Sequence, residues 1–499
     1  MIAGSLLPEG NIGDFMSSMF WSKASFKRKS AVAALVEEIR GLLKARDFPK
    51  AEEVCALGLA RYPDEGGLLS EHAQISVREG NWPAALKRLG RLLDIQGVSS
   101  DRDKTVLGLA RVFVAMGQPA EAEARIAMGL AIHPASIALR YAAAKAAALR
   151  PGGPQDASAW RDLAATRKLH HQKDSTRIPL ISACVAGLRL AGFPEEARIL
   201  FAEHFDPADE AWRKYAKDGF GRLIVFDNGK TRVEFYTKLF DASHQPAEAR
   251  RLVITFDIMT QTWDGKPYTY KALSPFDNDF LAVRKRTKQD FHQDFSRADF
   301  LRVAAPVAAL YPDVVAFGQS LGGYCALYYG TMLPQCRILA TAPRNPQNPK
   351  YSGKEHARED LFLHAYDMPG NQTASPTIVF DPKNAEDGRY IEESLRPAFP
   401  NASFFPYPYT GHSITRYMLE AGILKSATIG FCEGVPFPEF DRGLRAGSAE
   451  YLRNLASRSF AAGRRKWALA LALRAKDLGT YPERTEAILK KIGYDAPVQ

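Results

Sequence analysis

The sequence is poor in cysteine and contains no long hydrophobic run. No stretch of about 18 consecutive apolar residues occurs, so we expect no transmembrane helix. The first 29 residues have no apolar core followed by a small-residue cleavage site, which argues against a signal peptide. The 5 cysteines are scattered without metal-ligand spacing, a usage typical of buried thiols in a reducing compartment. We therefore expect a cytoplasmic protein of 499 residues, in two or three domains, with no metal or cofactor.

An excess of positive charge requires an explanation. The net charge is +10, and basic residues cluster at residues 27–29, 284–288 and 464–466. Such clusters can attract nucleic acid, an anionic membrane surface, a nucleotide sugar or an acidic glycan. They can also form an ordinary solvated surface, and no nucleic-acid-binding motif accompanies them. We expect a solvated surface and no nucleic-acid partner, and leave peripheral contact with an anionic surface open.

Two regions of the chain share an internal repeat, in which a small residue is followed by glycine seven positions later and by alanine five further on. Its copies are Ala73-Gly80-Ala85, Ala110-Gly117-Ala122, Val185-Gly192-Ala197 and, near the C-terminus, Ala456-Gly463-Ala468. An earlier copy at Phe48 and Ala51 has Arg46 where the glycine would fall. Small residues let two antiparallel helices approach closely, with the glycine at the turn between them. The pattern predicts helical hairpins, with a generic helical bundle as the alternative.

Between about residues 218 and 446 the pattern changes to short β-rich runs separated by helical stretches. Eight candidate strands are residues 222–226, 232–236, 252–256, 280–283, 314–317, 338–341, 377–380 and 403–407. The first two are joined by Asp227-Asn228-Gly229-Lys230, a hairpin signal. The longer, partly helical connections between the later strands predict parallel strands with crossover helices.

One motif in this region carries nucleophile chemistry. The apolar run Val314 to Phe317 leads into Gly318-Gln319-Ser320-Leu321-Gly322, and a helix-forming stretch follows at once. A strand that delivers a serine into a sharp turn before a helix is what a nucleophile elbow requires. We predict Ser320 as the nucleophile.

A serine needs a base to take its proton and a carboxylate to orient that base. His412 follows the last β-rich run directly and precedes a helix, so we predict it as the base. Three carboxylates follow the strand at residues 377–380, namely Asp381, Glu386 and Asp387. We favour Asp387, which can reach across to the histidine loop, and keep Asp381 as the main alternative acid, although it could instead brace a loop.

The oxyanion formed during acyl transfer needs backbone donors. One should be the N–H of Leu321 at the start of the helix after Ser320. The second should come from the loop after the strand at residues 252–256, where we predict the N–H of Ile258. Many lipases carry His-Gly there, whereas this chain has Phe256-Asp257.

Five further residues have two interpretations each. Arg344 follows the strand at residues 338–341, where a substrate carboxylate or phosphate could bind. Cys325 is expected to be a buried small hydrophobic residue rather than a reactive thiol. Trp263, Asp264 and His292 could line a pocket, but we expect them at the surface.

The middle region resembles the α/β-hydrolase superfamily through Gly318 to Gly322, Asp387 and Gly411-His412-Ser413. The repeat regions resemble tetratricopeptide repeats. The resemblance implies a mostly parallel eight-stranded sheet with helices on both faces, flanked by helical repeats. The expected organisation is a poorly ordered lead-in, a repeat domain, a hydrolase domain and a repeat-like C-terminal hairpin, at residues 1–29, 30–217, 218–446 and 447–499.

The combination of both elements is similar in architecture to bacterial proteins associated with surface-polysaccharide synthesis and glycan acylation. This resemblance implies a serine esterase with a Ser-His-Asp triad and an acyl-enzyme intermediate, for which acylated glycans are one candidate class of substrate. An acyltransferase with the same triad is the first alternative. A non-catalytic scaffold that binds protein partners through the repeats is the second.

Overall fold

The computed structural model describes most of the chain. The described residues are 12–99, 101–148, 158–165, 174–206, 208–215, 219–239, 251–353 and 357–494. The chain divides into two compact units, residues 1–143 and 144–499, and each is described by itself. The boundary that we expected between residues 217 and 218 lies outside the described residues.

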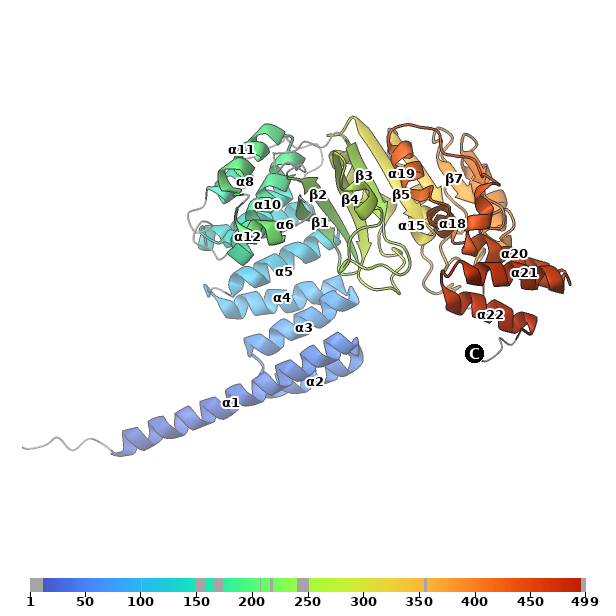
Figure 1. The fold of residues 1–499 in the computed structure, drawn as a ribbon. Helices are drawn as coiled ribbons and strands as arrows, with labels where there is room; N and C mark the ends of the chain where they lie inside the picture. Colours follow the sequence, from blue (N-terminus) through green and yellow to red (C-terminus); the bar gives the residue numbers. More distant parts are fainter. Residues whose placement is uncertain are drawn as a thin grey trace, which may run out of the picture. The chain divides into compact units, whose positions relative to one another are not determined.

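The first unit is built from antiparallel helices (Figure 1). These are α1 (Ile12–Ala45), α2 (Phe48–Arg61), α3 (Gly66–Glu79), α4 (Trp82–Gln96), α5 (Arg102–Ala115) and α6 (Pro119–Ile132), and α7 (Ile137–Ala148) crosses the division between the units. Part of the expected lead-in is helical, because α1 begins at Ile12 and no proline interrupts it.

The turns between paired helices follow the repeat frame. Gly80 and Gly117 take the left-handed conformation, with φ of 76° and 74°. Arg46, at the position where the first copy lacks glycine, takes the same conformation with φ of 64°. The alanines that were expected at close helix contacts are buried, and Ala73 and Ala85 are both 0% exposed. The prediction of helical hairpins is therefore confirmed.

The second unit contains an eight-stranded sheet in the order β1-β2-β4-β3-β5-β6-β7-β8. The strands are β1 (Phe220–Asp227), β2 (Thr231–Lys238), β3 (Arg251–Phe256), β4 (Asn278–Lys285), β5 (Asp313–Gln319), β6 (Cys336–Thr341), β7 (Thr377–Phe380) and β8 (Ser403–Pro406). All eight predicted strands are present, with ends shifted by a few residues. β2 is antiparallel to both β1 and β4, and the remaining pairs are parallel. The predicted hairpin joins β1 to β2.

The second unit also contains helices, some of which cover the two faces of the sheet. They are α8 (Ser158–Ala164), α10 (Asp174–Leu190), α11 (Pro194–His204), α12 (Glu210–Tyr215), α13 (Tyr270–Leu273), α14 (Arg297–Ala308), α15 (Leu321–Gly330), α16 (Ala385–Tyr390), α17 (Arg396–Ala398), α18 (Ile414–Glu420), α19 (Leu424–Cys432), α20 (Ala449–Ala461), α21 (Arg465–Asp477) and α22 (Pro482–Ile492). Phe256 of β3 packs on Tyr329 of α15, with ring centroids 5.8 Å apart. Phe317 of β5, which faces the other way, packs on Phe431 of α19 at 5.5 Å. Alternating side chains thus bury both faces of the sheet.

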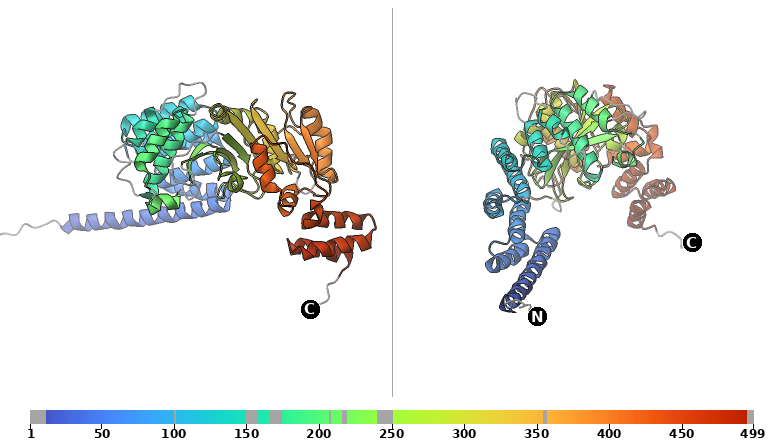
Figure 2. Two further views of the ribbon diagram at one scale, coloured as in Figure 1. Left: turned by 45° about the horizontal axis from the view of Figure 1, so that its top comes forward. Right: turned by 90° about the vertical axis from the view of Figure 1, so that its left-hand side faces the viewer.

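Repeat-like helices lie at both ends of this unit (Figure 2). At the β1 and β2 edge, Arg189 of α10 donates from Nη1 to Thr237 Oγ1 at 2.7 Å. At the other end, Glu420 of α18 accepts from Ser448 Oγ at 2.6 Å and from the Glu450 N–H at 2.9 Å. The C-terminal hairpin therefore packs on the sheet-containing fold through α18 and α20.

Two expectations about surface position were wrong. Arg284 and Lys285 are each 0% exposed, although we assigned them to a solvated basic cluster. They are the last residues of β4, and buried carbonyl and carboxylate oxygens take their hydrogen bonds. His292, also expected at the surface, is 0% exposed. Local charge density did not reveal this burial because β4 is covered on both faces.

Candidate active site

Ser320 occupies a strained turn between β5 and α15. Its φ of 54° and ψ of −120° are unusual for a residue with a side chain. The turn is fixed by its main chain, since the Ser320 N–H donates to Thr341 O at 2.9 Å. The Ser320 carbonyl in turn accepts from the N–H groups of Tyr324 at 2.9 Å and Arg344 at 3.1 Å. These bonds hold the serine at the carboxyl end of the parallel strands.

Two glycines of the motif allow the backbone to close this tightly. A Cβ atom at Gly318 would lie 1.9 Å from Gly322 O, a distance that no side chain could tolerate. A Cβ at Gly322 would lie 2.7 Å from Phe256 O, so the end of β3 is packed directly on the turn. The glycine spacing thus has a steric cause on both sides of the serine.

The structure brings Ser320, His412 and Asp387 together. His412 Nε2 lies 2.8 Å from Ser320 Oγ. On the other side of the ring, Nδ1 lies 2.9 Å from Asp387 Oδ2 and 3.1 Å from Oδ1. The Asp387 side chain is buried at 2% exposure, while that of His412 is 28% exposed. An Nδ1–H that donates to Asp387 leaves Nε2 free to accept the serine proton.

Asp381 has a different place, although it also follows β7. Its Oδ1 accepts from the N–H groups of Lys383 at 2.7 Å and Tyr409 at 3.0 Å. Its Oδ2 accepts from the Gly411 N–H at 2.7 Å. Asp381 therefore braces the loop that carries His412, the second of the two roles considered for it.

Glu386 and Arg344 form a charged pair beside the triad. Arg344 Nη1 lies 3.3 Å from Asp387 Oδ1 and also hydrogen-bonds Glu386. The guanidinium charge is thus balanced by carboxylates of the protein itself. Glu386 does not take the place of the acid, because its partner is Arg344.

The two predicted oxyanion donors differ in their surroundings. Leu321 is the first residue of α15, so its N–H lies at the positive end of a helix. The Ile258 N–H donates to Gln261 Oε1 at 3.2 Å, and the Gln261 N–H donates back to Ile258 O at 3.1 Å. Sequence reasoning missed this reciprocal pair, which joins two residues three positions apart in one turn.

The remaining candidates lie apart from the triad. Cys325 is 0% exposed on α15, and burial raises the pKa of its thiol, which agrees with the prediction of a buried small residue. Trp263 stacks with Arg232, whose guanidinium carbon lies 4.0 Å from the ring centroid. Asp264 is exposed as expected.

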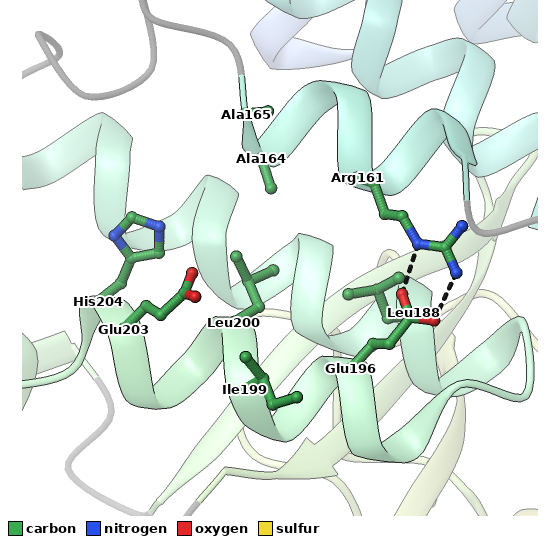
Figure 3. A pocket seen from close by; sticks show the side chains of 9 residues that line it. All are labelled: Arg161, Ala164, Ala165, Leu188, Glu196, Ile199, Leu200, Glu203 and His204. Carbon is green, nitrogen blue, oxygen red and sulfur yellow. Dashed lines mark hydrogen bonds and ion pairs between the residues drawn. The ribbon is translucent and has the colours of Figure 1, made fainter.

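A pocket of about 340 Å³ lies between α8, α10 and α11. Figure 3 shows Glu196 of α11 paired with Arg161 of α8 at one end, next to Leu188. Ile199 and Leu200 lie in the middle of the view, with Glu203 and His204 at the other end. α10 packs against β1, whereas Ser320 follows β5, with three strands between them in the sheet. This pocket is therefore separate from the triad.

The described residues contain neither a membrane-spanning helix nor a metal-binding cluster. None of the described helices combines the length and apolar character needed to span a bilayer. Among the same residues, no three His, Cys, Asp or Glu side chains are grouped so that they could hold a metal ion.

Comparisons with known proteins identify part of the chain. A search of curated proteins found no match. Solved structures with similarity include Est1E from Butyrivibrio proteoclasticus, at 11% identity, covering 43% of this chain and 98% of that one, with a TM-score of 0.29. A putative kinesin light chain repeat protein from Podosopora anserina is 18% identical, covers 38% and 97%, and has a TM-score of 0.31.

An O-GlcNAc transferase from Thermobaculum terrenum is 12% identical, covers 93% of this chain and 94% of that one, and has a TM-score of 0.26. TM-scores of this size do not establish a shared fold. A family model does match, and it identifies residues 76–148 as tetratricopeptide repeat.

Proposed function

We propose that the sheet-containing unit is a serine esterase with an α/β-hydrolase fold. The observation that carries this proposal is the hydrogen-bonded chain from Ser320 through His412 to Asp387, set on a strained turn at the carboxyl end of β5. The strand order, with the serine after β5 and the histidine after β8, supports the fold assignment.

The reaction follows from these positions. His412 Nε2 accepts the hydroxyl proton as Ser320 Oγ attacks the ester carbonyl carbon, and the carbonyl oxygen becomes an oxyanion. The Leu321 N–H stabilises that charge at the start of α15. The imidazolium, held by Asp387, then gives its proton to the leaving alcohol, and the C–O bond breaks to leave an acyl group on Ser320. Water, activated by His412, releases the acid and restores the serine.

The test is covalent labelling of the intact protein. A fluorophosphonate should react at Ser320, and mass spectrometry should locate the adduct there. Ser320→Ala should abolish both the adduct and the release of p-nitrophenol from short-chain esters. Absence of labelling in a folded wild-type protein would reject the enzyme proposal.

A separate measurement decides whether the acyl group is transferred to water or to another hydroxyl. The same ester is incubated with and without a sugar acceptor, and acid and acylated sugar are both quantified. Acyl transfer that outpaces hydrolysis would favour the acyltransferase. An acetylated sugar as donor tests the proposed link to glycans.

The repeats support a second component of the function. Residues 76–148 match tetratricopeptide repeat, a module that typically mediates protein interactions. We therefore place the proposed enzyme in an assembly with a protein partner. A partner that is lost on mutation of the repeat surface, but retained by Ser320→Ala, would support this role.

A further inference from the structure

The last two residues of β4, Arg284 and Lys285, are fully buried cations. Both hydrogen-bond to the segment that follows β3, residues 257–265. Arg284 Nε donates to Asp257 Oδ1 at 2.7 Å. Its Nη2 donates to Thr262 O at 2.6 Å and to Gly265 O at 3.1 Å. A single guanidinium therefore ties the first residue of the segment to its last.

Lys285 holds the middle of the same segment. Its Nζ donates to Met259 O at 2.7 Å and to the carbonyls of Thr287 and Lys288, each at 3.3 Å. Its backbone N–H donates to Asp257 Oδ2 at 3.1 Å. Asp257 thus accepts one bond from the Arg284 guanidinium and one from the Lys285 backbone N–H, and it is itself 0% exposed.

Arg284 Nη1 also lies 3.5 Å from Oε2 of Glu234, which is likewise 0% exposed. Burying these four charged side chains is costly, and apolar residues of similar size would often give an equally stable packing. What such a cluster can provide is a single backbone conformation. Hydrogen bonds from Arg284 and Lys285 fix the backbone of residues 257–265 at four acceptor groups. These are the Asp257 carboxylate and the carbonyls of Met259, Thr262 and Gly265. The Asp257 side chain, where many lipases have glycine, is turned inward to this cluster.

The segment begins in contact with the Ser320 turn. A Cβ at Gly322 would lie 2.7 Å from Phe256 O and 3.6 Å from Asp257 O. Ile258 is the next residue, and its N–H is the predicted second oxyanion donor. We propose that Arg284 and Lys285 are positioning residues that hold the backbone of Ile258 beside the nucleophile. This inference rests on the proposed esterase function.

A pH-dependent readout separates this role from simple packing. Burial lowers the pKa of Lys285 to about 8, so its ammonium loses a proton just above neutral pH. The neutral amine has one donor fewer for the three carbonyls. The charged or titratable groups that face it are Asp257, Asp290, Lys288, Cys325 and His292. An arginine at this position would remain charged throughout.

The experiment compares Lys285→Met and Lys285→Arg with wild type and with Lys230→Met, an exposed lysine in the β1–β2 hairpin. For a short-chain ester, Lys285→Met should lower kcat at least 10-fold with KM changed less than 2-fold. Its affinity for a boronic acid, which mimics the tetrahedral intermediate, should fall in parallel. Lys230→Met should behave as wild type.

The pH dependence of kcat is the second part of the experiment. Wild-type kcat should decline above pH 8, and Lys285→Arg should move that decline to higher pH. The inference is overturned if kcat of wild type and of Lys285→Arg declines over the same pH range. It is also overturned if Lys285→Met loses activity only in proportion to its unfolded fraction.

Failure of the proposed function would show itself differently, as absence of fluorophosphonate labelling in wild type. In that case hydrogen exchange still tests whether Lys285 holds the backbone of residues 257–265. Amides of residues 258–265 should exchange at least 10-fold faster in Lys285→Met than in Lys230→Met, and equal rates would overturn the inference.

Discussion

Asp381 Oδ2 accepts a 2.7 Å hydrogen bond from the N–H of Gly411, the residue directly before His412. The first carboxylate after β7 therefore holds the histidine loop by its backbone, whereas Asp387 contacts the imidazole ring itself. The loop residue Asp381 and Asp387 of α16 thus have separate tasks, and substitution of each should affect a different property of the protein.

Asp387→Asn should lower kcat by roughly 10³ to 10⁴, because an amide favours the wrong histidine tautomer. The thermal midpoint should change little, since the side chain keeps its shape. Ester hydrolysis and calorimetry on one preparation measure both. A loss below 10-fold would remove Asp387 from the triad.

Asp381→Ala should mainly destabilise the fold. Three backbone N–H groups would lose their acceptor, and the cost should be at least about 2 kcal/mol in the free energy of unfolding. Urea denaturation measures that change, and Asp381→Asn is the matched control because it keeps one acceptor oxygen. Unchanged stability in Asp381→Ala would contradict the bracing role.

Gln261→Ala should raise the rate of fluorophosphonate labelling. The Ile258 N–H is now bonded to Gln261 Oε1 at 3.2 Å and must be released before it can stabilise an oxyanion. A net hydrogen bond of about 0.5–1.5 kcal/mol corresponds to roughly a 2- to 10-fold increase. Gln261→Glu, a stronger acceptor, should slow labelling. Slower labelling of Gln261→Ala would mean that the glutamine supports the turn.

Arg46→Gly should stabilise the α1–α2 hairpin. Arg46 is exposed and has φ of 64°, a conformation that disfavours a side chain by about 1 kcal/mol. Hydrogen exchange of α1 and α2 amides in the intact chain should slow accordingly. Lys44→Gly, within the last turn of α1, should have the opposite effect because glycine weakens a helix. Faster exchange in both variants would contradict the prediction.

The sheet-containing unit should lose stability in acid through two buried histidines. Burial lowers the pKa of His292 to about 3 and that of His364 to about 4. In the unfolded chain both titrate near 6.5. The unfolded state therefore binds more protons below pH 6.5, and stability declines from there towards pH 4. Each histidine should lower the free energy of unfolding by about 2 kcal/mol when the pH falls from 7.5 to 5.

His364→Phe isolates this effect from the titration of carboxylates. The His364 ring stacks on Tyr328 with centroids 4.2 Å apart, and phenylalanine can keep that contact. The difference in urea midpoint between pH 7.5 and 5 should be smaller in the variant than in wild type. Equal differences would exclude His364 as a source of acid sensitivity.

Much of the fold could be read from local pattern. The strands of the second unit alternate with helices at spacings that predict parallel pairing, and the Gly318 to Gly322 motif marks the turn after β5. The repeat frame predicted the hairpin turns, including Arg46. These features depend on residues close together in the sequence, where periodicity and steric demands act directly.

The tertiary structure decided what depends on distant residues. It brought Asp387, rather than Asp381, to His412 and buried Arg284 and Lys285 against residues 257–265. It also packed α10 on the β1 edge and α20 on α18. The sequence by itself determined which elements form and where the turn that carries Ser320, the proposed nucleophile, lies. Only the packing of those elements decided which carboxylate meets the histidine and which charges are buried, because burial and charge pairing arise between segments that meet only when folded.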